Sequence, residues 1–483
     1  MNKNVKNNNI NHSYPDQKII NSFSEIVGAK HILLDEDDMQ PYLSEPRNLY
    51  KAKAACVLKP GSVLEISNIL KIANDNNIAI VPQGGNTGLV GGQIPYDEGN
   101  EVILSLSRLN KLREVDISTN SITIEAGMTL DKVQKLADKN DRFFPLSLGS
   151  EGSCQIGGNL ATNAGGVAVI EYGNTRELTL GLEVVLADGK ILNGLKSLRK
   201  DNTGYDLKNI FIGSEGTLGI ITAATMKLFP KPKNIISTFV SLKDLDSGVN
   251  LLNFLREKSM NKITSFELMP KIGIELVQKH KPDAKIPLKV LNDWSALIEF
   301  SSNDTFDSAR EDLENNLFEA INKGYITDCV IAESIAQSID FWRIRHFIVE
   351  VQAYEGGSIK HDISIPIAKI PKFINDANII AEYVYPASRP IPFGHIGDGN
   401  IHYNVTQPIN EKTDKFLEKW HDMSDKIHDL VIELNGSISA EHGIGRMKRD
   451  ELYERSDPTK NHIMKNIKNA LDTKGILNPG KVL

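Results

Sequence analysis

The segment PFGHIGDGNIHYNV, residues 392–405, gathers two histidines, an aspartate and two asparagines between glycines. From Asn400 onward polar and apolar residues alternate, so a strand would place Asn400, His402 and Asn404 on one face. His395 precedes this strand in a glycine-bracketed loop, which can bend far enough to bring both imidazoles to one point. Two neutral imidazoles suit a divalent metal such as zinc or manganese. We therefore predict a metal site whose third ligand lies elsewhere in the chain.

A third ligand is available in SISAEHGIG, residues 437–445. Glu441 and His442 are adjacent, so their side chains project in different directions, and Gly443 and Gly445 favour irregular backbone over a helix interior. One side chain could bind the metal while the other handles protons. A single histidine is more often structural than a ligand, but the two segments together favour a site. The HExxH and CxxC zinc patterns are absent, so the metal prediction depends on these two segments alone.

Three glycine-rich blocks lie upstream of these segments. VPQGGNTGLVGGQIP, residues 81–95, follows an apolar run typical of a buried strand, and such a loop exposes several backbone N–H groups to one anion. Neither the GxGxxG of a Rossmann turn nor the Lys-Ser/Thr pair of a P-loop follows that strand. The other blocks occupy residues 149–166 and 213–222. Their spacing indicates one long ligand threaded along several loops, and a dinucleotide has that length.

Together these motifs resemble the FAD-linked oxidases and dehydrogenases of the vanillyl-alcohol oxidase type, in the branch with D-2-hydroxyglutarate dehydrogenase and D-lactate dehydrogenase. The resemblance covers residues 40–483 and implies an α+β fold with a two-subdomain FAD-binding domain, a cap domain on a large antiparallel sheet, and a helical C-terminal segment. It implies non-covalent FAD, because relatives with covalent flavin use a histidine in the first loop, where this chain has none. The residues implied to contact FAD are Pro82, Gly84, Gly85, Asn86, Thr87, Gly88, Gly152, Gly157, Gly158, Thr162, Asn163, Gly165, Gly216, Ile220 and Asn478.

The same resemblance assigns the metal ligands and the base. In this branch the HxGDGNxHxN segment supplies two histidine ligands and the later EHG supplies a glutamate. This implies His395, His402 and Glu441 as ligands of a divalent metal, zinc in the first place, and His442 as general base. A metal on the 2-hydroxyl of the substrate lowers the pKa of that hydroxyl, and a neighbouring imidazole takes the proton. The hydride on C2 then passes to the flavin.

The family also uses an arginine and a lysine to hold the substrate carboxylate, at a spacing that implies Arg345 and Lys360 here. Arginine can bind a carboxylate bidentately. Asn400 and Asn404 would contact the substrate from the strand face described above. The relative specific for hydroxyglutarate has a hydroxyl side chain four residues after the arginine, whereas this chain has Val349. Hydroxyglutarate, lactate and other 2-hydroxy acids therefore all stay open as substrates.

The implied function is that of an FAD-dependent dehydrogenase that oxidises a D-2-hydroxy acid to the 2-keto acid. Because the chain lacks the Rossmann fingerprint, we expect electrons to pass to a quinone or an electron-transfer flavoprotein rather than to NAD. The alternative is a non-redox FAD enzyme of the alkyl-dihydroxyacetone-phosphate synthase type, which would need a phosphate-binding cap and a long apolar tunnel. The sequence indicates neither. A non-enzymatic binding protein would have no reason to combine a base, two cations and three metal ligands.

Composition limits the other classes of function. The chain has 483 residues, 40% of them hydrophobic, which suffices for two or three domains with full cores. A formal net charge of −7 and the lack of a basic stripe argue against nucleic acid as a partner. Three scattered cysteines fit a reducing compartment. The first residues match neither a transit peptide nor a secretory signal, and no apolar run is long enough to span a membrane.

These observations predict a bacterial cytoplasmic location, with the inner face of the membrane as an alternative because quinone-reducing flavin dehydrogenases often touch it. A homodimer is one option for the assembly. The proline-rich joint PKPKN, residues 230–234, marks the main domain boundary. The expected organisation is an N-terminal lead (1–46), an FAD-binding domain (47–229), a substrate or cap domain (230–410) and a C-terminal helical segment (411–483) that returns to the FAD domain.

Overall fold

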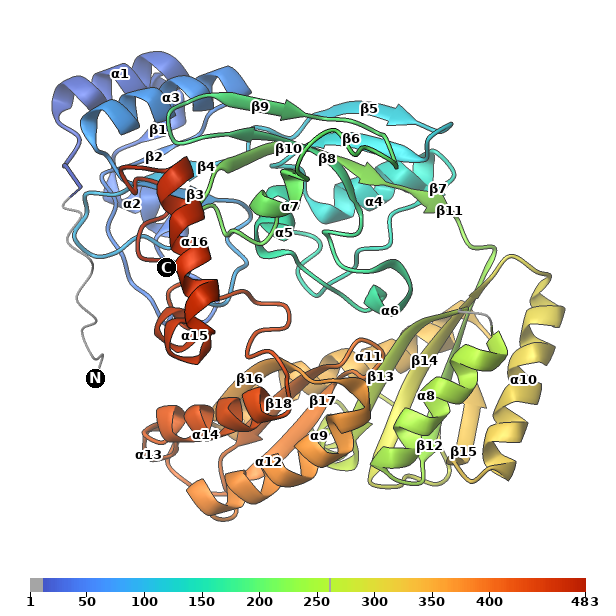
Figure 1. Ribbon diagram of the computed structural model, residues 1–483. Coiled ribbons are helices and arrows are strands. Elements are labelled where there is room, and N and C mark those ends of the chain that lie inside the picture. The colour runs from blue at the N-terminus through green and yellow to red at the C-terminus, as the bar shows by residue number, and fades with distance from the viewer. Residues whose placement is uncertain (1–11, 260–261) are drawn as a thin grey trace. The chain divides into compact units, whose positions relative to one another are not determined.

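The computed structural model describes residues 12–259 and 262–483, which form two compact units (Figure 1). Unit 1 comprises residues 12–165, 174–231 and 441–483. Unit 2 comprises Gly166–Gly173 and the described part of Pro232–Ala440. Both units mix helices with β-sheets, as expected for an α+β protein. The first eleven positions of the expected N-terminal lead lie outside the described residues.

The first sheet of unit 1 has the strand order β1-β2-β4-β3, and both β2 and β3 run parallel to β4. Parallel strands need cover on both faces, and Val57 and Ile103 are fully buried here. Helix α3 begins after Ser62, whose hydroxyl accepts a hydrogen bond from the Glu65 N–H. The elements are α1 (Gln17–Val27), η1 (Ala29–His31), β1 (Ile32–Leu33), α2 (Glu36–Met39), η2 (Gln40–Tyr42), β2 (Cys56–Leu58), α3 (Val63–Asn76), β3 (Ile80–Gln83) and β4 (Val102–Ser105).

The second sheet of unit 1 is antiparallel, in the order β5-β6-β10-β8-β9. Arg113 on β5 forms ion pairs with Glu125 on β6 and with Glu183 on β8, which ties three strands together. The two sheets match the two subdomains expected for the FAD-binding domain. The elements are β5 (Leu112–Asp116), β6 (Ser121–Glu125), α4 (Leu130–Lys139), β7 (Arg142–Phe143), α5 (Ile156–Thr162), β8 (Thr179–Val185), β9 (Ile191–Gly194), α7 (Lys208–Phe211), β10 (Ile220–Lys227) and β11 (Phe229–Pro230).

The last segment of the chain belongs to unit 1 and contains α15 (Arg449–Arg455) and α16 (Pro458–Leu471). After α16 the chain runs beside β3, where the Ile80 N–H donates to the Ile476 carbonyl and the Asn478 N–H donates to the Ile80 carbonyl. The first sheet therefore contains residues from both ends of unit 1.

Lys481, near the end of this segment, is a buried cation. Its side chain is fully buried, its Nζ lies 3.3 Å from Glu101 Oε1, and it lies over the ring of Tyr96. Burial lowers the pKa of Lys481 to about 8. The ion pair therefore fixes the last residues against the interior of unit 1.

Unit 2 is built on one antiparallel sheet of seven strands in the order β15-β12-β14-β13-β17-β18-β16. Its strands are β12 (Asn234–Leu242), β13 (Ile263–Pro270), β14 (Trp294–Ser302), β15 (Ile326–Ile331), β16 (Ser358–Ser364), β17 (Arg389–His395) and β18 (Asn400–Thr406). Its helices are α6 (Val169–Tyr172), α8 (Leu245–Ser259), α9 (Lys271–His280), α10 (Phe306–Asn322), α11 (Ile335–Val351), η3 (Gln352–Glu355), η4 (Ile367–Lys369), α12 (Ile370–Val384), α13 (Thr413–Leu417) and α14 (Trp420–Glu433). This sheet matches the large antiparallel sheet expected for the cap.

The two faces of this sheet differ in what covers them. Helices α8, α10, α12 and α14 pack on one face, where alternate strand residues such as Phe266 and Tyr403 contribute to a large core. Helices α9 and α11 pack on the other face against Met269, Leu297 and Phe393. Among the described residues, no helix combines the length and the apolar character needed to cross a membrane.

The structure divides the chain differently from the expected organisation. Helices α13 and α14 belong to unit 2, because Met423, Ile427 and Val431 of α14 pack into its large core. The second boundary therefore falls after Ala440 rather than near residue 410. Unit 2 also takes in residues 166–173, where Ile170 packs against the same core.

Replacing Lys481 with methionine should destabilise the flavin-free protein by about 3–5 kcal/mol, because Glu101 would remain buried without its cation. The loss should appear as a lower urea midpoint of unfolding. The double variant Lys481→Met with Glu101→Gln should recover part of it, since no unpaired charge is left behind. Lys190→Met, at an exposed ion pair with Asp188, is the control and should shift the midpoint little. An unchanged midpoint for Lys481→Met would contradict the buried pair.

Candidate active site

A cavity of about 630 Å³ in unit 1 is lined by all three glycine-rich blocks. This volume is typical of a small-molecule or cofactor site. Thirteen of the fifteen residues predicted to contact FAD line it, from Pro82 to Asn478. The other two, Gly152 and Asn163, do not. Asn163 ends α5 in the left-handed conformation, and its Oδ1 accepts the Arg176 N–H instead.

Amide oxygens in the cavity wall show which kind of ligand the cavity suits. Five buried side-chain oxygens that line the cavity have no hydrogen-bond partner within the described protein. Buried polar groups are almost always paired, so such a cluster indicates a missing donor. The hydroxyl and N–H groups of FAD are donors of this kind. The five oxygens are Gln83 Oε1, Asn86 Oδ1, Gln155 Oε1, Asn159 Oδ1 and Asn478 Oδ1.

The glycines of the cavity wall serve two different purposes. A Cβ on Gly85 would lie 2.0 Å from the Ser153 carbonyl oxygen, and a Cβ on Gly157 would lie 2.8 Å from the Ala126 Cβ. These two glycines are required by the packing of the protein itself. A Cβ on Gly158 would meet no protein atom within 4 Å, although Gly158 lines the cavity. Its missing side chain therefore leaves room for a ligand.

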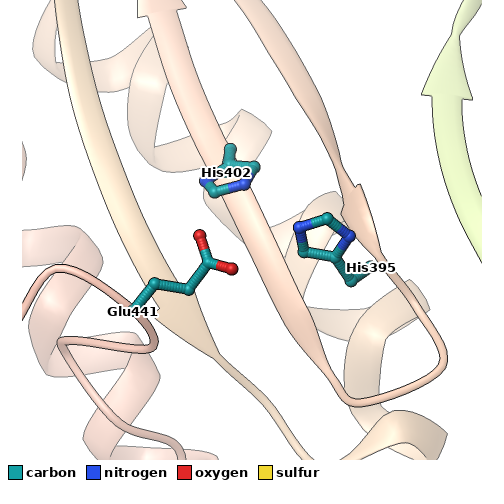
Figure 2. A group of neighbouring side chains, drawn as sticks. All are labelled: His395, His402 and Glu441. Atoms are coloured by element: carbon teal, nitrogen blue, oxygen red, sulfur yellow. The ribbon is translucent and has the colours of Figure 1, made fainter. Parts of the chain in front are cut away.

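The predicted metal ligands come together. His395 ends β17, His402 lies on the neighbouring strand β18, and Figure 2 shows the Glu441 carboxylate pointing toward both rings. One ligand atom from each of the three side chains lies within 4.8 Å of the other two. Two imidazoles and a carboxylate form a common donor set for catalytic zinc, so these residues fit the implied metal. Their positions are fixed by two adjacent strands and one loop.

The loop before Glu441 is held by the sheet of unit 2. Ser437 exchanges two backbone hydrogen bonds with Ser364 at the end of β16, so the chain reaches Ala440 from a fixed strand edge. Glu441 follows directly, and both Glu441 and His442 line the cavity of unit 1. This loop has no helical structure, as expected from its glycines.

A second group of side chains surrounds His442. One ligand atom each from Asp362, Glu441 and His442 lies within 4.8 Å of the others. Asp362 is buried on β16 and lies opposite His402 across the β16–β18 pair, with 3.8 Å between its Oδ1 and His402 Nδ1. His442 therefore lies close to two carboxylates, which can orient an imidazole that takes up a proton.

Glu215 fixes the backbone just beyond His442. Its two carboxylate oxygens accept the N–H groups of Ile444 and Gly445 at 2.7 and 2.8 Å. Burial raises the pKa of Glu215 to about 7, against the opposite effect of these two donors. Glu215 also has a φ of 51°, in the left-handed region that disfavours a residue with a long side chain. The side chain is therefore needed at a backbone position that would suit glycine better.

Arg345, predicted to bind a substrate carboxylate, is buried on α11 and already has one anionic partner. Its Nε donates to Glu267 Oε2 at 2.7 Å, and its guanidinium lies 4.8 Å from the ring centre of Phe393. The other carboxylate oxygen of Glu267 lies 2.5 Å from His395 Nδ1. Burial opposes ionisation of Glu267, but His395 and Arg345 outweigh it and hold the pKa of that carboxyl well below its usual range.

The other predicted substrate residues lie on the paired strands β16 and β18. Lys360 is exposed on β16 and lies opposite Asn404 of β18. The side-chain amide of Asn404 donates to Gln352 Oε1, and that of Asn400 donates to Asp362 and to the Ile363 carbonyl. Strands β13, β17, β18 and β16 thus carry polar residues of the predicted site on the sheet face that also carries Phe393.

Sequence reasoning assigned no role to Glu267, Asp362 or Glu215. Glu267 has the clearest signal, since it lies in the otherwise weakly polar strand ITSFELMP, where a carboxylate must find a partner. Asp362 has a similar setting in KHDISIP. Nothing in the sequence around Glu215 indicates that its side chain reaches residues 444 and 445.

The contrast between two neighbouring glycines gives a test of the cavity. Gly158→Ala should stabilise the flavin-free protein by about 0.5 kcal/mol, because alanine is the better helix former in α5, yet it should lower the flavin retained after dialysis. Gly157→Ala should instead destabilise the flavin-free protein by about 1–3 kcal/mol through overpacking against Ala126. Urea midpoints and the ratio of flavin to protein absorbance measure both effects. Full flavin retention in Gly158→Ala would rule out Gly158 as part of the cofactor site.

Comparison with known proteins places this architecture in a family. The family model described as "FAD linked oxidases, C-terminal domain" matches residues 231–482, and that described as "FAD binding domain" matches residues 54–194. Among solved structures, p-cresol methylhydroxylase has a TM-score of 0.75 and alkyldihydroxyacetonephosphate synthase one of 0.74, each at 17% identity. These alignments cover 96% and 98% of this chain, and 96% and 86% of the respective structures. At that identity the likeness shows the fold alone.

Curated relatives are more similar in sequence. The mitochondrial D-2-hydroxyglutarate dehydrogenase of Arabidopsis thaliana is 37% identical over 97% of this chain and 82% of its own length. The D-2-hydroxyglutarate dehydrogenase of Xanthomonas citri pv. viticola is 34% identical, with 97% of both chains covered. The D-2-hydroxyglutarate–pyruvate transhydrogenase of Saccharomyces cerevisiae is 33% identical over 97% of this chain and 96% of its own. The chain therefore belongs to the FAD-linked oxidases and dehydrogenases of the vanillyl-alcohol oxidase type, in the branch that contains the D-2-hydroxyglutarate dehydrogenases.

Proposed function

We propose that this protein is an FAD-dependent dehydrogenase that oxidises a D-2-hydroxy acid, D-2-hydroxyglutarate in the first place, to the 2-keto acid. The observation that carries the proposal is the group His395, His402 and Glu441, whose last member also lines the cofactor cavity. A metal-binding group and a flavin cavity suit the removal of a proton from the 2-hydroxyl of the substrate and of a hydride from its C2. The names of the relatives supply the substrate class.

When bound, a divalent cation would lower the pKa of the substrate 2-hydroxyl, and FAD would accept the hydride from C2. His395, His402 and Glu441 would hold the cation, with zinc as the first expectation. His442 would take the hydroxyl proton, as its position beside Asp362 and Glu441 allows. The proton, the hydride and the new carbonyl bond together account for the two-electron oxidation.

Arg345 and Lys360 would hold the carboxylates of the substrate. Arg345 engages Glu267 through Nε, which leaves its terminal amino groups for a carboxylate. Asn400 would hydrogen-bond the substrate, and its buried Oδ1 has no partner within the described protein. Asn404 would contact the substrate beside it. A diacid such as 2-hydroxyglutarate could use both cations, whereas lactate has a single carboxylate.

The remaining parts of the proposal concern the flavin and the electron acceptor. FAD would bind non-covalently, since the first glycine-rich loop has no histidine. A quinone or an electron-transfer flavoprotein would take the electrons, in the cytoplasm or at the inner face of the membrane. The name of the yeast relative pairs D-2-hydroxyglutarate with pyruvate, so a 2-keto acid is a further acceptor to test.

Anaerobic mixing with candidate substrates tests the reaction. D-2-hydroxyglutarate should bleach the visible band of the bound flavin, and D-lactate, D-malate and glycolate should bleach it more slowly. Adding a quinone analogue or pyruvate afterwards should restore the band if that compound is an acceptor, while NAD should not restore it. If no 2-hydroxy acid bleaches the flavin, the dehydrogenase assignment is wrong and the non-redox alternative gains support.

Two histidine variants separate the metal from the base. His402→Ala, like treatment with a chelator, should abolish flavin reduction by substrate while the flavin spectrum stays intact, because the cavity residues lie in other segments. His442→Ala should retain the metal and lower the rate of flavin reduction by a factor of about 10² to 10⁴. Metal analysis of the folded proteins and stopped-flow absorbance measure the two effects. Full activity in His442→Ala, or loss of metal from it, would contradict the assignment.

A further inference from the structure

The carboxylate of Glu267 touches both a predicted metal ligand and a predicted substrate-binding cation, although neither the metal nor the substrate assignment includes it. We propose that Glu267 is the positioning residue of the active site, which sets the orientation of His395 toward the metal and of Arg345 toward the substrate carboxylate. The inference rests on the proposed function, because it explains how the two halves of that site are held in register.

The pairing of β13 with β17 places Glu267 directly opposite His395. Residues paired in this way on antiparallel strands project to the same face of the sheet. Glu267 Oε1 lies 2.5 Å from His395 Nδ1. The contact pairs Nδ1 with a carboxylate oxygen, which accepts a hydrogen bond, so Nδ1 is the donor; in the neutral imidazole that a metal requires, Nε2 then keeps its lone pair. Glu267 therefore selects the tautomer in which Nε2 is the metal ligand.

The second oxygen of Glu267 accepts the Arg345 Nε–H at 2.7 Å. The guanidinium plane is rigid, so fixing Nε and packing it on the Phe393 ring also fixes the direction of the two terminal amino groups. Phe393 in turn lies opposite His402 on β18, with 5.1 Å between the ring centres. Arg345, His395 and His402 are thus connected through Glu267 and the ring of Phe393.

The complete burial of Glu267 makes its hydrogen-bond partners hard to replace. Glu267 has no exposed surface, and its described hydrogen-bond partners are His395, Arg345 and the Ser265 hydroxyl. Water cannot replace a lost partner at such a position, so the side chains must keep their contacts. A glutamine at this position would keep the shape, but it would lose the charge and turn one acceptor into a donor that faces a hydrogen-bond donor.

Glu299 offers a matched control. It lies on the neighbouring strand β14, is partly buried, and accepts hydrogen bonds from Trp342 Nε1 at 2.7 Å and from the Ser237 hydroxyl at 3.0 Å. None of its described hydrogen bonds reaches His395 or Arg345. Glu299→Gln therefore makes the same chemical change at a neighbouring carboxylate that has no described hydrogen bond to His395 or Arg345.

The experiment measures zinc affinity of the full-length flavoprotein by competition with a chromophoric chelator after the metal has been removed. Glu267→Gln should bind zinc about 10- to 100-fold more weakly than the unchanged protein, whereas Glu299→Gln should bind it normally. Cobalt should show an altered visible spectrum in Glu267→Gln alone. KM for the hydroxy acid should also rise in that variant, because Arg345 loses its orientation. Flavin content should stay unchanged in both variants.

The outcomes separate this inference from the function on which it rests. If the unchanged protein binds no zinc or cobalt, the metal part of the proposed function fails. If it binds zinc and Glu267→Gln matches Glu299→Gln in affinity, cobalt spectrum and KM, Glu267 is a structural residue only and the inference fails. Should Glu267→Gln not fold, Glu267→Asp replaces it in the test. Aspartate keeps the charge but is too short to reach both partners, so zinc affinity or KM should still change, and if neither changes the inference is refuted.

Discussion

Charged and polar side chains that leave water must find partners, and the site in unit 2 depends on how Glu267 meets this requirement. The groups that compensate its charge are an imidazole and a guanidinium that both belong to the predicted site. A carboxylate in an apolar strand would otherwise cost several kcal/mol, so selection for a stable sheet and selection for a well-oriented site act on the same contacts. A change that weakens the contact of Glu267 with His395 should therefore also alter its contact with Arg345, and the reverse.

The cavity of unit 1 meets the same requirement in another way. Its wall contains buried amide oxygens, among them those of Gln155 and Asn159, whose partners the protein itself does not supply. A ligand that donates hydrogen bonds to them removes a cost that the empty protein bears, so FAD binding should contribute to the stability of unit 1 as well as to catalysis. The glycines leave room for the ligand, and the unpaired amide oxygens favour a ligand that donates hydrogen bonds.

Local patterns in the sequence were sufficient for much of this structure. The alternation from Asn400 to Val405 predicted both the strand β18 and the face on which His402 lies, because a period of two has a single structural meaning. The glycine blocks predicted the cofactor cavity, since their composition is needed wherever backbone must approach a ligand. These features depend on short stretches of chain. The roles of the individual metal, base and substrate residues stay predictions until they are measured.

Features that depend on distant contacts could not be predicted. Glu267 and His395 are 128 positions apart, and only the order of strands in the sheet makes them neighbours. Gly152 and Asn163 lie within the predicted block but outside the cavity wall, and the Asn163 side chain instead accepts the N–H of Arg176, 13 positions further along the chain. The boundary after Ala440 depends on which core the apolar face of α14 enters, and the helix has the same pattern in either case.

The chain passes between the two units four times, at residues 165/166, 173/174, 231/232 and 440/441. During synthesis on the ribosome, unit 2 has all of its segments once Ala440 has emerged, whereas unit 1 still lacks the stretch that pairs with β3 and carries Lys481. The unit that starts first is therefore the one that finishes last. Until then the β3 edge of the first sheet lacks its neighbour, and an unpaired strand edge is prone to aggregation.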